Sequence, residues 1–155
     1  MPWRRNRRRA AAFVAFGMRT FVRMSLAIGF CIDAGVAVVA LFFQSLLGPL
    51  FDLPLKDPAL TTIAGGEYIV VAFVYALVFR EPERYRALLW VCALDQLLAA
   101  LLPGIEIARG NVAATYKTIG PIPLSALLAA AYVWSALRFA RDPRRSASHP
   151  NARNP

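Results

Sequence analysis

The stretch WVCALDQLLAALLP, residues 90–103, is apolar almost throughout but carries Asp95 and Gln96 side by side at its centre. With its neighbours it forms an apolar segment at about 85–102, close to the roughly 20 residues that a helix needs to cross a bilayer. An ionised carboxylate is costly in that interior, so Asp95 should have a partner there or hold a proton. The stretch therefore predicts a membrane helix and marks Asp95 as a candidate functional residue.

Three further apolar stretches have a similar length, at residues 24–47, 62–79 and 119–140. The chain of 155 residues is 58% hydrophobic and 17% charged, whereas soluble domains carry about 25% charged residues. Its mean hydropathy is +0.49. Because the hydrocarbon offers no water to backbone amides, these spans should be helices. We therefore predict an all-α integral membrane protein, with a four-helix bundle over residues 23–142 and no sizeable soluble domain.

The distribution of cations predicts the orientation in the membrane. Of the 18 lysines and arginines, 15 lie in the N-terminal segment, in the link at 80–86 and from residue 138 onward, and three lie in the other two links. In a chain with four spans, the two termini and the link at 80–86 lie on one face of the membrane, and the other two links lie on the opposite face. The face that carries more cations is usually cytoplasmic. We expect both termini in the cytoplasm of a bacterium, with the chain in its inner membrane. The net charge of +9 should serve to attract anionic lipid headgroups, and we do not expect the chain to bind nucleic acid.

The two ends of the chain carry separate predictions. The basic segment 1–22 resembles a signal peptide, but Arg19 and Arg23 follow its apolar part and lead into a span, so we expect an uncleaved segment that contains an interfacial helix. The tail 143–155 is rich in proline, serine and asparagine and is expected to be disordered and cytoplasmic. It holds His149, the only histidine, so the sequence predicts no metal site and no catalytic residue.

Two acids are expected at mid-membrane depth. Asp33 and Asp95 lie in spans that run in the same direction, and no lysine or arginine stands at their level. They either share a proton, as a proton-handling pair or a small-molecule site, or are each protonated and join helices by hydrogen bonds. The candidate hydrogen-bond partners of this polar pocket are Gln96, Gln44, Tyr75 and Tyr132.

A second group of polar residues is expected near the outer face. Glu67 follows two glycines at the start of the second span, and the third link supplies cations on the same side. These residues either form an outer pocket or lie in water with structural ion pairs. The candidates are Glu67, Tyr68, Arg109, Tyr116 and Lys117.

Cys31 and Cys92 stand close to the two acids in sequence. We expect both thiols to be buried, where a thiol is inert and packs as a small apolar group. The alternative is a redox pair, which would need the two Cα atoms within about 7 Å of each other.

The run GGEYIVVAFVYALVFREPERYRALLWVCALDQLLAAL, residues 65–101, resembles the central part of small four-span bacterial proteins of the DoxX-like group, including its BphX-like relatives. The pieces that carry the resemblance are Gly65, Gly66 and Glu67, then the arginine-rich turn 80–86, then Asp95 and Gln96. The resemblance implies a mostly uncharacterised group in which some members are membrane subunits of quinone-linked thiosulfate oxidation or of oxidative-stress complexes.

Three functions follow as hypotheses. The first is a non-catalytic membrane subunit or scaffold, such as a subunit of a redox or quinone-linked complex, with a protein partner or a second copy of the chain. The second is a proton-coupled carrier or binding protein that uses Asp33 and Asp95. The third is an enzyme that resembles membrane-embedded sterol isomerases with buried carboxylates. The sequence itself contains no evident cofactor motif, and the resemblance allows a quinone or lipid-like ligand beside the lipid bilayer.

Overall fold

The structure, a computed structural model, describes residues 3–52 and 57–141, with side chains from residue 17 onward. Within these ranges it contains helices and no strand. Four segments are long and apolar enough to cross a membrane, namely Gly17–Phe42, Pro58–Arg80, Leu88–Ala108 and Tyr116–Ala140. The predicted all-helical, multi-pass architecture is confirmed. The elements in chain order are α1 (Trp3–Phe42), the 3-10 helix η1 (Gln44–Leu46), α2 (Leu47–Phe51), α3 (Pro58–Arg80), α4 (Leu88–Ala108), α5 (Tyr116–Ile119) and α6 (Pro121–Ala140).

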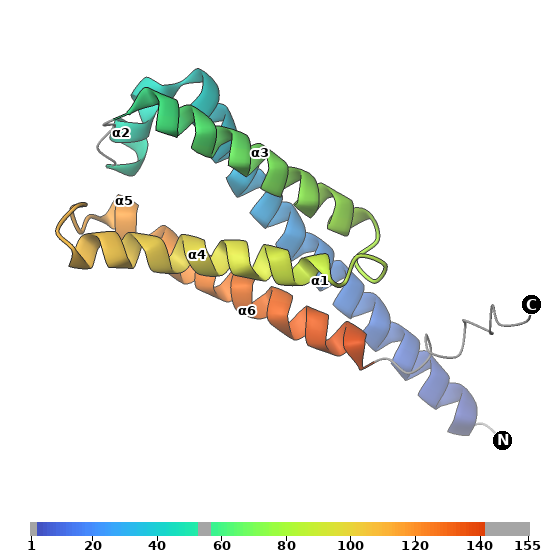
Figure 1. Cartoon of the computed structure of the whole chain (residues 1–155). Coiled ribbons are helices and arrows are strands. Elements are labelled where there is room, and N and C mark those ends of the chain that lie inside the picture. The colour runs from blue at the N-terminus through green and yellow to red at the C-terminus, as the bar shows by residue number, and fades with distance from the viewer. Residues whose placement is uncertain (1–2, 53–56, 142–155) are drawn as a thin grey trace, which may run out of the picture.

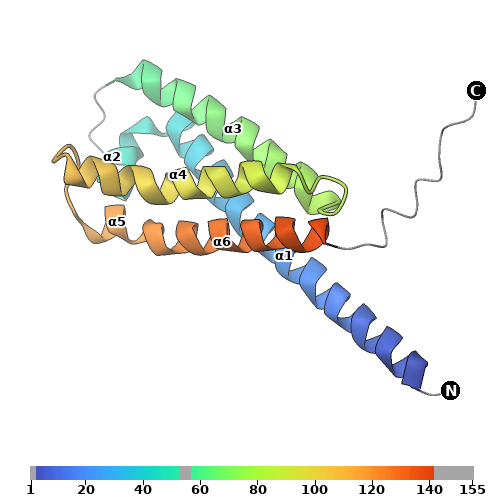
Figure 2. The same ribbon diagram turned by 60° about the horizontal axis from the view of Figure 1, so that its bottom comes forward.

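The long helices are arranged as two pairs. α1 packs along α3, and α4 packs along α6, with fewer contacts between the pairs. The pairs lie close together where α3 turns into α4 and separate toward the end that carries α2 and α5 (Figure 1). The N-terminal part of α1 extends beyond the other helices (Figure 2). The bundle therefore has a closely packed end, at the α3–α4 turn, and an end at which the pairs diverge.

The core lies toward the closely packed end and is built from residues three or four apart on each helix. This spacing places side chains on one face of a helix, so every long helix presents one packed stripe. Large apolar side chains elsewhere point outward, and Phe73 and Leu127 are 70% and 69% exposed, as expected for helices surrounded by lipid. The main core side chains are Val22, Leu26, Tyr75, Val78, Leu89, Cys92, Leu128 and Tyr132.

Several helix boundaries differ from the predicted ones. α1 ends at Phe42, five residues early, because Phe43 leaves the helical conformation with φ −134°. α3 begins four residues early at Pro58, because the Asp57 side chain accepts the backbone N–H of Ala59 at 2.8 Å and caps the helix. Proline at the first helical position favours this start.

Two further predictions concern the ends of spans. α4 continues through Pro103 to Ala108, which membrane helices tolerate when other groups satisfy the freed carbonyl. The segment before the first span is helical and continuous with it in α1, as expected of a helix that runs into the span. The predicted disordered tail, 143–155, lies outside the described residues.

Candidate functional site

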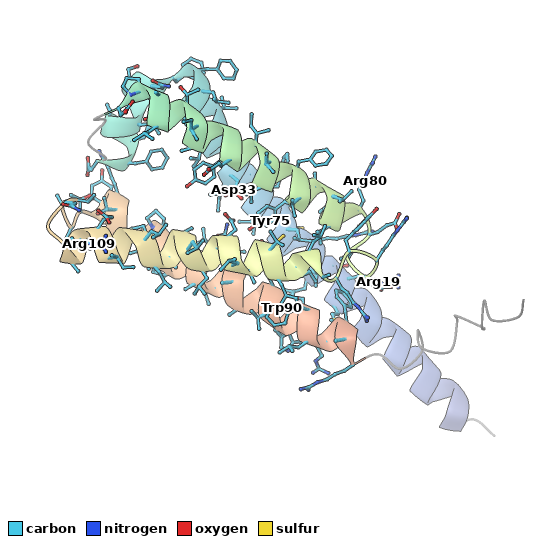
Figure 3. The ribbon with its side chains drawn as sticks, in the orientation of Figure 1. Arg19, Asp33, Tyr75, Arg80, Trp90 and Arg109 are labelled. Carbon is cyan, nitrogen blue, oxygen red and sulfur yellow. The ribbon has the colours of Figure 1, made fainter. Side chains whose placement is uncertain are left out.

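The structure brings the two mid-membrane acids together. Asp33 comes from α1 and Asp95 from α4, and their carboxyl groups lie close enough to interact with each other. Asp33 is 3% exposed and Asp95 is half-buried. Figure 3 shows Asp33 in the region between the two helix pairs, with Tyr75 of α3 near it. Two adjacent carboxyl groups in an apolar interior rarely both ionise, so this arrangement favours a proton held between them.

Neighbouring side chains donate hydrogen bonds to Asp95. The Tyr75 hydroxyl lies 3.0 Å from Asp95 Oδ2 and 3.2 Å from the carbonyl oxygen of Cys92. The side-chain amide of Gln96 lies 3.0 Å from the same Asp95 oxygen. Asp95 therefore receives donors from α3 and from its own helix.

Two buried oxygens at this site have no donor. Among the described residues, Asp33 Oδ2 and Gln96 Oε1 are the buried side-chain atoms that lack a hydrogen-bond partner. A buried acceptor without a partner typically costs about 1–3 kcal/mol. Both atoms belong to residues that contact Asp95, so the cluster can accept hydrogen bonds from a further donor group.

Tyr132 and Gly29 form the side of this cluster that faces the core. The Tyr132 hydroxyl donates to the carbonyl oxygen of Ser25 at 2.7 Å, and its ring centroid lies 5.8 Å from that of Tyr75. A Cβ at Gly29 would lie 2.6 Å from Tyr75 Cε1 and 2.7 Å from the Tyr132 hydroxyl. Only glycine fits there without displacing a ring.

Sequence reasoning missed Ser25 and Gly29, although a signal was present. Ser25, Gly29 and Asp33 are spaced four residues apart, which places them on one face of α1. A small residue one turn before a buried acid leaves room for a side chain from another helix to approach the helix backbone at that point. Here those side chains are the rings of Tyr75 and Tyr132.

Gln44 does not join the cluster, contrary to its predicted place in the polar pocket. It lies in η1, beyond the end of α1, and its amide nitrogen is 2.9 Å from Thr62 Oγ1 and 3.5 Å from the carbonyl oxygen of Pro58. The early end of α1 places Gln44 at the start of α3, where it ties η1 to that helix.

The predicted outer-face group is divided between three places. Glu67 is exposed, and because α3 begins at Pro58 it lies about 14 Å along the helix, deeper than predicted. Tyr68 is half-buried and lies within electrostatic range of both central acids. Arg109 pairs with Glu106 at 3.1 Å. Tyr116 is 82% exposed, so these side chains do not form one pocket.

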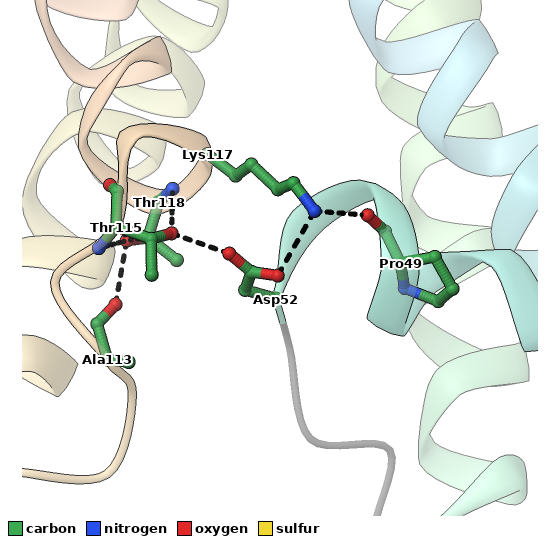
Figure 4. Close-up of polar contacts among 6 residues, drawn as sticks. All are labelled: Pro49, Asp52, Ala113, Thr115, Lys117 and Thr118. Atoms are coloured by element: carbon green, nitrogen blue, oxygen red, sulfur yellow. Dashed lines mark hydrogen bonds and ion pairs between the residues drawn. The ribbon is translucent and has the colours of Figure 1, made fainter.

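Lys117 takes part in a bridge between α2 and α5 (Figure 4). Its Nζ lies 2.6 Å from the carbonyl oxygen of Pro49 and 3.3 Å from Asp52 Oδ1. Thr115 donates its hydroxyl to Asp52 Oδ2 at 2.7 Å. The hydrogen bond from Thr115, aided by the Lys117 cation, holds the pKa of Asp52 below its usual value. The bridge therefore joins the helix pairs at their diverging end.

The two cysteines are free and differ in burial. Cys92 is buried, whereas Cys31 is exposed, so the prediction that both are buried is wrong for Cys31. Residues two apart on a helix point to nearly opposite sides. Because Asp33 faces the core, Cys31 faces outward.

No group of three or more His, Cys, Asp or Glu side chains is placed to hold a metal ion in the ranges that the structure describes. Comparison with protein families, with curated proteins and with solved structures finds no match to this chain. The resemblance to the DoxX-like group therefore stays a prediction, and function has to be argued from the site itself.

Proposed function

We propose that this chain is a proton-coupled carrier or binding protein of the membrane, with Asp33 and Asp95 as its binding groups. The observation that carries the proposal is the proximity of these two buried or half-buried carboxyl groups inside a bundle of membrane-length helices. Ionisable residues in membrane spans are costly to keep, and pairs of them commonly form proton relays or substrate sites.

The free acceptors define the class of ligand. Asp33 Oδ2 and Gln96 Oε1 lack donors, and a second proton loss would leave two adjacent carboxylates. A small organic cation, or a neutral molecule with N–H or O–H groups, would satisfy these oxygens. Uptake of the cation in exchange for the shared proton would keep the charge of the site nearly constant, whereas a neutral ligand would bind with the proton retained.

The arrangement of the helix pairs suits a carrier. Asp33 belongs to the α1–α3 pair and Asp95 to the α4–α6 pair, and the pairs share fewer contacts with each other than within themselves. In many transporters the binding site lies near mid-membrane between two units that rock against each other. Loss of the carboxyl contact on ligand binding would release one connection between the pairs.

We also propose that the chain lies in a bacterial inner membrane with both termini in the cytoplasm. The start of α1, the α3–α4 turn and the end of α6 lie at one end of the bundle (Figure 1). The cation-rich segments of the sequence belong to this end, and the positive-inside rule assigns it to the cytoplasm.

Infrared difference spectroscopy between acid and alkaline pH tests for the shared proton in protein held in lipid nanodiscs. We expect a protonated-carboxyl band that is lost or displaced in Asp33→Asn and in Asp95→Asn. Glu81→Gln is the matched control, because it neutralises an exposed carboxylate that lies outside the spans and pairs with Arg84, and it should leave the band intact. An unchanged band in both aspartate variants would overturn the shared-proton site.

Binding of ethidium, a fluorescent cation with N–H donors, tests for the ligand class. We expect binding that strengthens with pH and that weakens about tenfold or more in either aspartate variant, because one charge-assisted hydrogen bond contributes about 1.5–3 kcal/mol. Equal affinity in the parent and in Asp33→Asn would contradict a role of this pair in cation binding.

A second candidate function is a membrane subunit or scaffold, and the outer surface of α6 favours it. Ala126 and Ala130 are exposed and one turn apart, a spacing that allows close packing of another membrane helix. Beside them, Phe21, Leu127 and Trp134 line an apolar hollow of about 360 Å³. Enlarging Ala130 to Leu should dissociate any assembly retained in mild detergent, and an unchanged elution volume would count against this candidate.

A further inference from the structure

Four arginines surround a hollow at the closely packed end of the bundle. The hollow has a volume of about 180 Å³ and lies between α1 and the α3–α4 turn. Figure 3 shows Arg19 and Arg80 at this end. The volume is below the roughly 300 Å³ of typical small-molecule pockets, so it suits a single charged group. Its charged lining is Arg19, Arg23, Arg80, Arg84, Glu81 and Glu83.

The charges of the lining leave an excess of two cations. Arg19 forms an ion pair with Glu83, and Arg84 pairs with Glu81 at 3.4 Å. Neither Arg23 nor Arg80 has an acidic partner among the residues that the structure describes. Arg23 instead donates to the backbone carbonyl oxygen of Arg80 at 3.1 Å, which places the two arginine residues beside each other. Both residues line the hollow, and guanidinium groups bind phosphate through several charge-assisted hydrogen bonds.

The position of the hollow relative to the spans selects the source of the phosphate. Arg80 is the last residue of α3 and of its span, so the hollow lies at the depth of lipid headgroups. The Arg23 guanidinium lies 5.9 Å from the ring centroid of Phe79, and Phe79 is 41% exposed on the surface that meets lipid. A phosphate in the hollow can therefore remain attached to acyl chains that lie against the bundle.

We propose that this hollow is a binding site for the phosphate of an anionic phospholipid. Arg23 and Arg80 supply the cations that bind the phosphate. Arg19 and Arg84 line the same hollow and are held by Glu83 and Glu81. The lipid would join α1 to the α3–α4 turn and stabilise the end at which the helix pairs meet. This site is separate from the acid cluster and does not depend on its function.

Titration of the detergent-solubilised full chain with phosphatidylglycerol that carries a fluorescent acyl chain tests the proposal. Each arginine near a membrane surface contributes about 1 kcal/mol to the attraction of anionic lipid, so Arg80→Gln should bind about fivefold more weakly than the parent. Arg80→Lys keeps the charge but not the planar guanidinium, so it should bind more weakly than the parent and more tightly than Arg80→Gln. Arg109→Gln, which removes an arginine at the other end of the bundle, should bind like the parent.

The competitors distinguish the sources of the phosphate. Unlabelled phosphatidylglycerol should displace the probe, whereas phosphatidylcholine and millimolar inorganic phosphate should not. Displacement by inorganic phosphate alone would overturn the lipid site and assign the hollow to a soluble anion. Equal binding of the probe by the parent and Arg80→Gln would overturn the site altogether, as would equal losses in Arg80→Gln and Arg109→Gln. A loss of binding in Arg80→Lys as large as in Arg80→Gln would show that charge does not determine binding.

Discussion

Two of the polar contacts between the α1–α3 pair and the α4–α6 pair place carboxyl groups in opposite surroundings. At the diverging end, Asp52 accepts hydrogen bonds from Lys117 and Thr115 and is partly exposed. In the middle of the bundle, Asp33 meets Asp95 with no cation between them. The end bridge is therefore strongest with its carboxylate ionised, whereas the central contact is favoured by a proton. The difference shows how a single chain can connect the same two units with opposite responses to pH.

Overpacking the central contact should have the largest effect of any change considered. In Gly29→Val the new side chain would collide with Tyr75 and Tyr132, whose atoms lie 2.6 and 2.7 Å from an ideal Cβ. We expect a loss of about 3 kcal/mol in the free energy of unfolding, measured by denaturation in mixed detergent micelles. Gly35→Val on the same helix is the control, because nothing lies within 4 Å of its Cβ. Equal losses in the two variants would contradict the close packing at Gly29.

Removing the hydroxyl that α3 donates to Asp95 should have a smaller effect. Tyr75→Phe keeps the buried ring but deletes the hydrogen bonds to Asp95 and to the carbonyl oxygen of Cys92. A buried acceptor that loses its donor costs about 1–3 kcal/mol. Tyr116→Phe removes the same hydroxyl from an exposed position and should leave stability within about 0.5 kcal/mol of the parent. If Tyr75→Phe were equally neutral, the Tyr75 hydroxyl would not support Asp95.

A double-mutant cycle sharpens the comparison by measuring the central contact alone. Asp33→Asn and Asp95→Asn each replace a carboxyl group by an amide of the same shape, and the pair should be non-additive by about 0.5–3 kcal/mol. The corresponding cycle of Asp33→Asn with Glu67→Gln should be additive, because Glu67 makes no contact with Asp33 in the described part of the chain. Additivity in both cycles would reduce the two aspartates to independent hydrogen-bonding groups.

The central site was the part of the molecule most accessible to sequence reasoning. Counting residues along parallel spans placed Asp33 and Asp95 at similar depth, and the regular rise of a helix makes such a count reliable. The same count predicted Gln96 and Tyr75 as hydrogen-bond partners of the two acids. The prediction that Gln44 belongs to the polar pocket was wrong because the count assumed a helix that continues to residue 47, whereas α1 ends at Phe42.

The end bridge was much less accessible, for a physical reason. Asp52 has φ +53°, in the left-handed region, immediately after the short helix α2, and its partners lie more than 60 residues away in another link. Links between spans have no periodicity that predicts such a contact. One local signal was available, because Asp57 followed by Pro58 is a typical helix start. It would have placed Glu67 deeper in the membrane.

The smallest expected effect concerns the pH dependence of the end bridge. The hydrogen bond from Thr115 and the Lys117 cation lower the pKa of Asp52 in the folded chain, so the bridge stabilises the fold above the ordinary aspartate pKa of about 4. That stabilisation is lost as the pH falls through the lowered value, when the carboxylate takes up a proton. The midpoint of thermal unfolding of Asp52→Asn should therefore lie slightly below that of the parent at pH 7 and approach it in acid. Because the bridge is partly exposed, added salt should also reduce the difference. A difference that instead widened in acid would assign to Asp52 the proton-dependent behaviour of the central pair, and the contrast between the two contacts would be wrong.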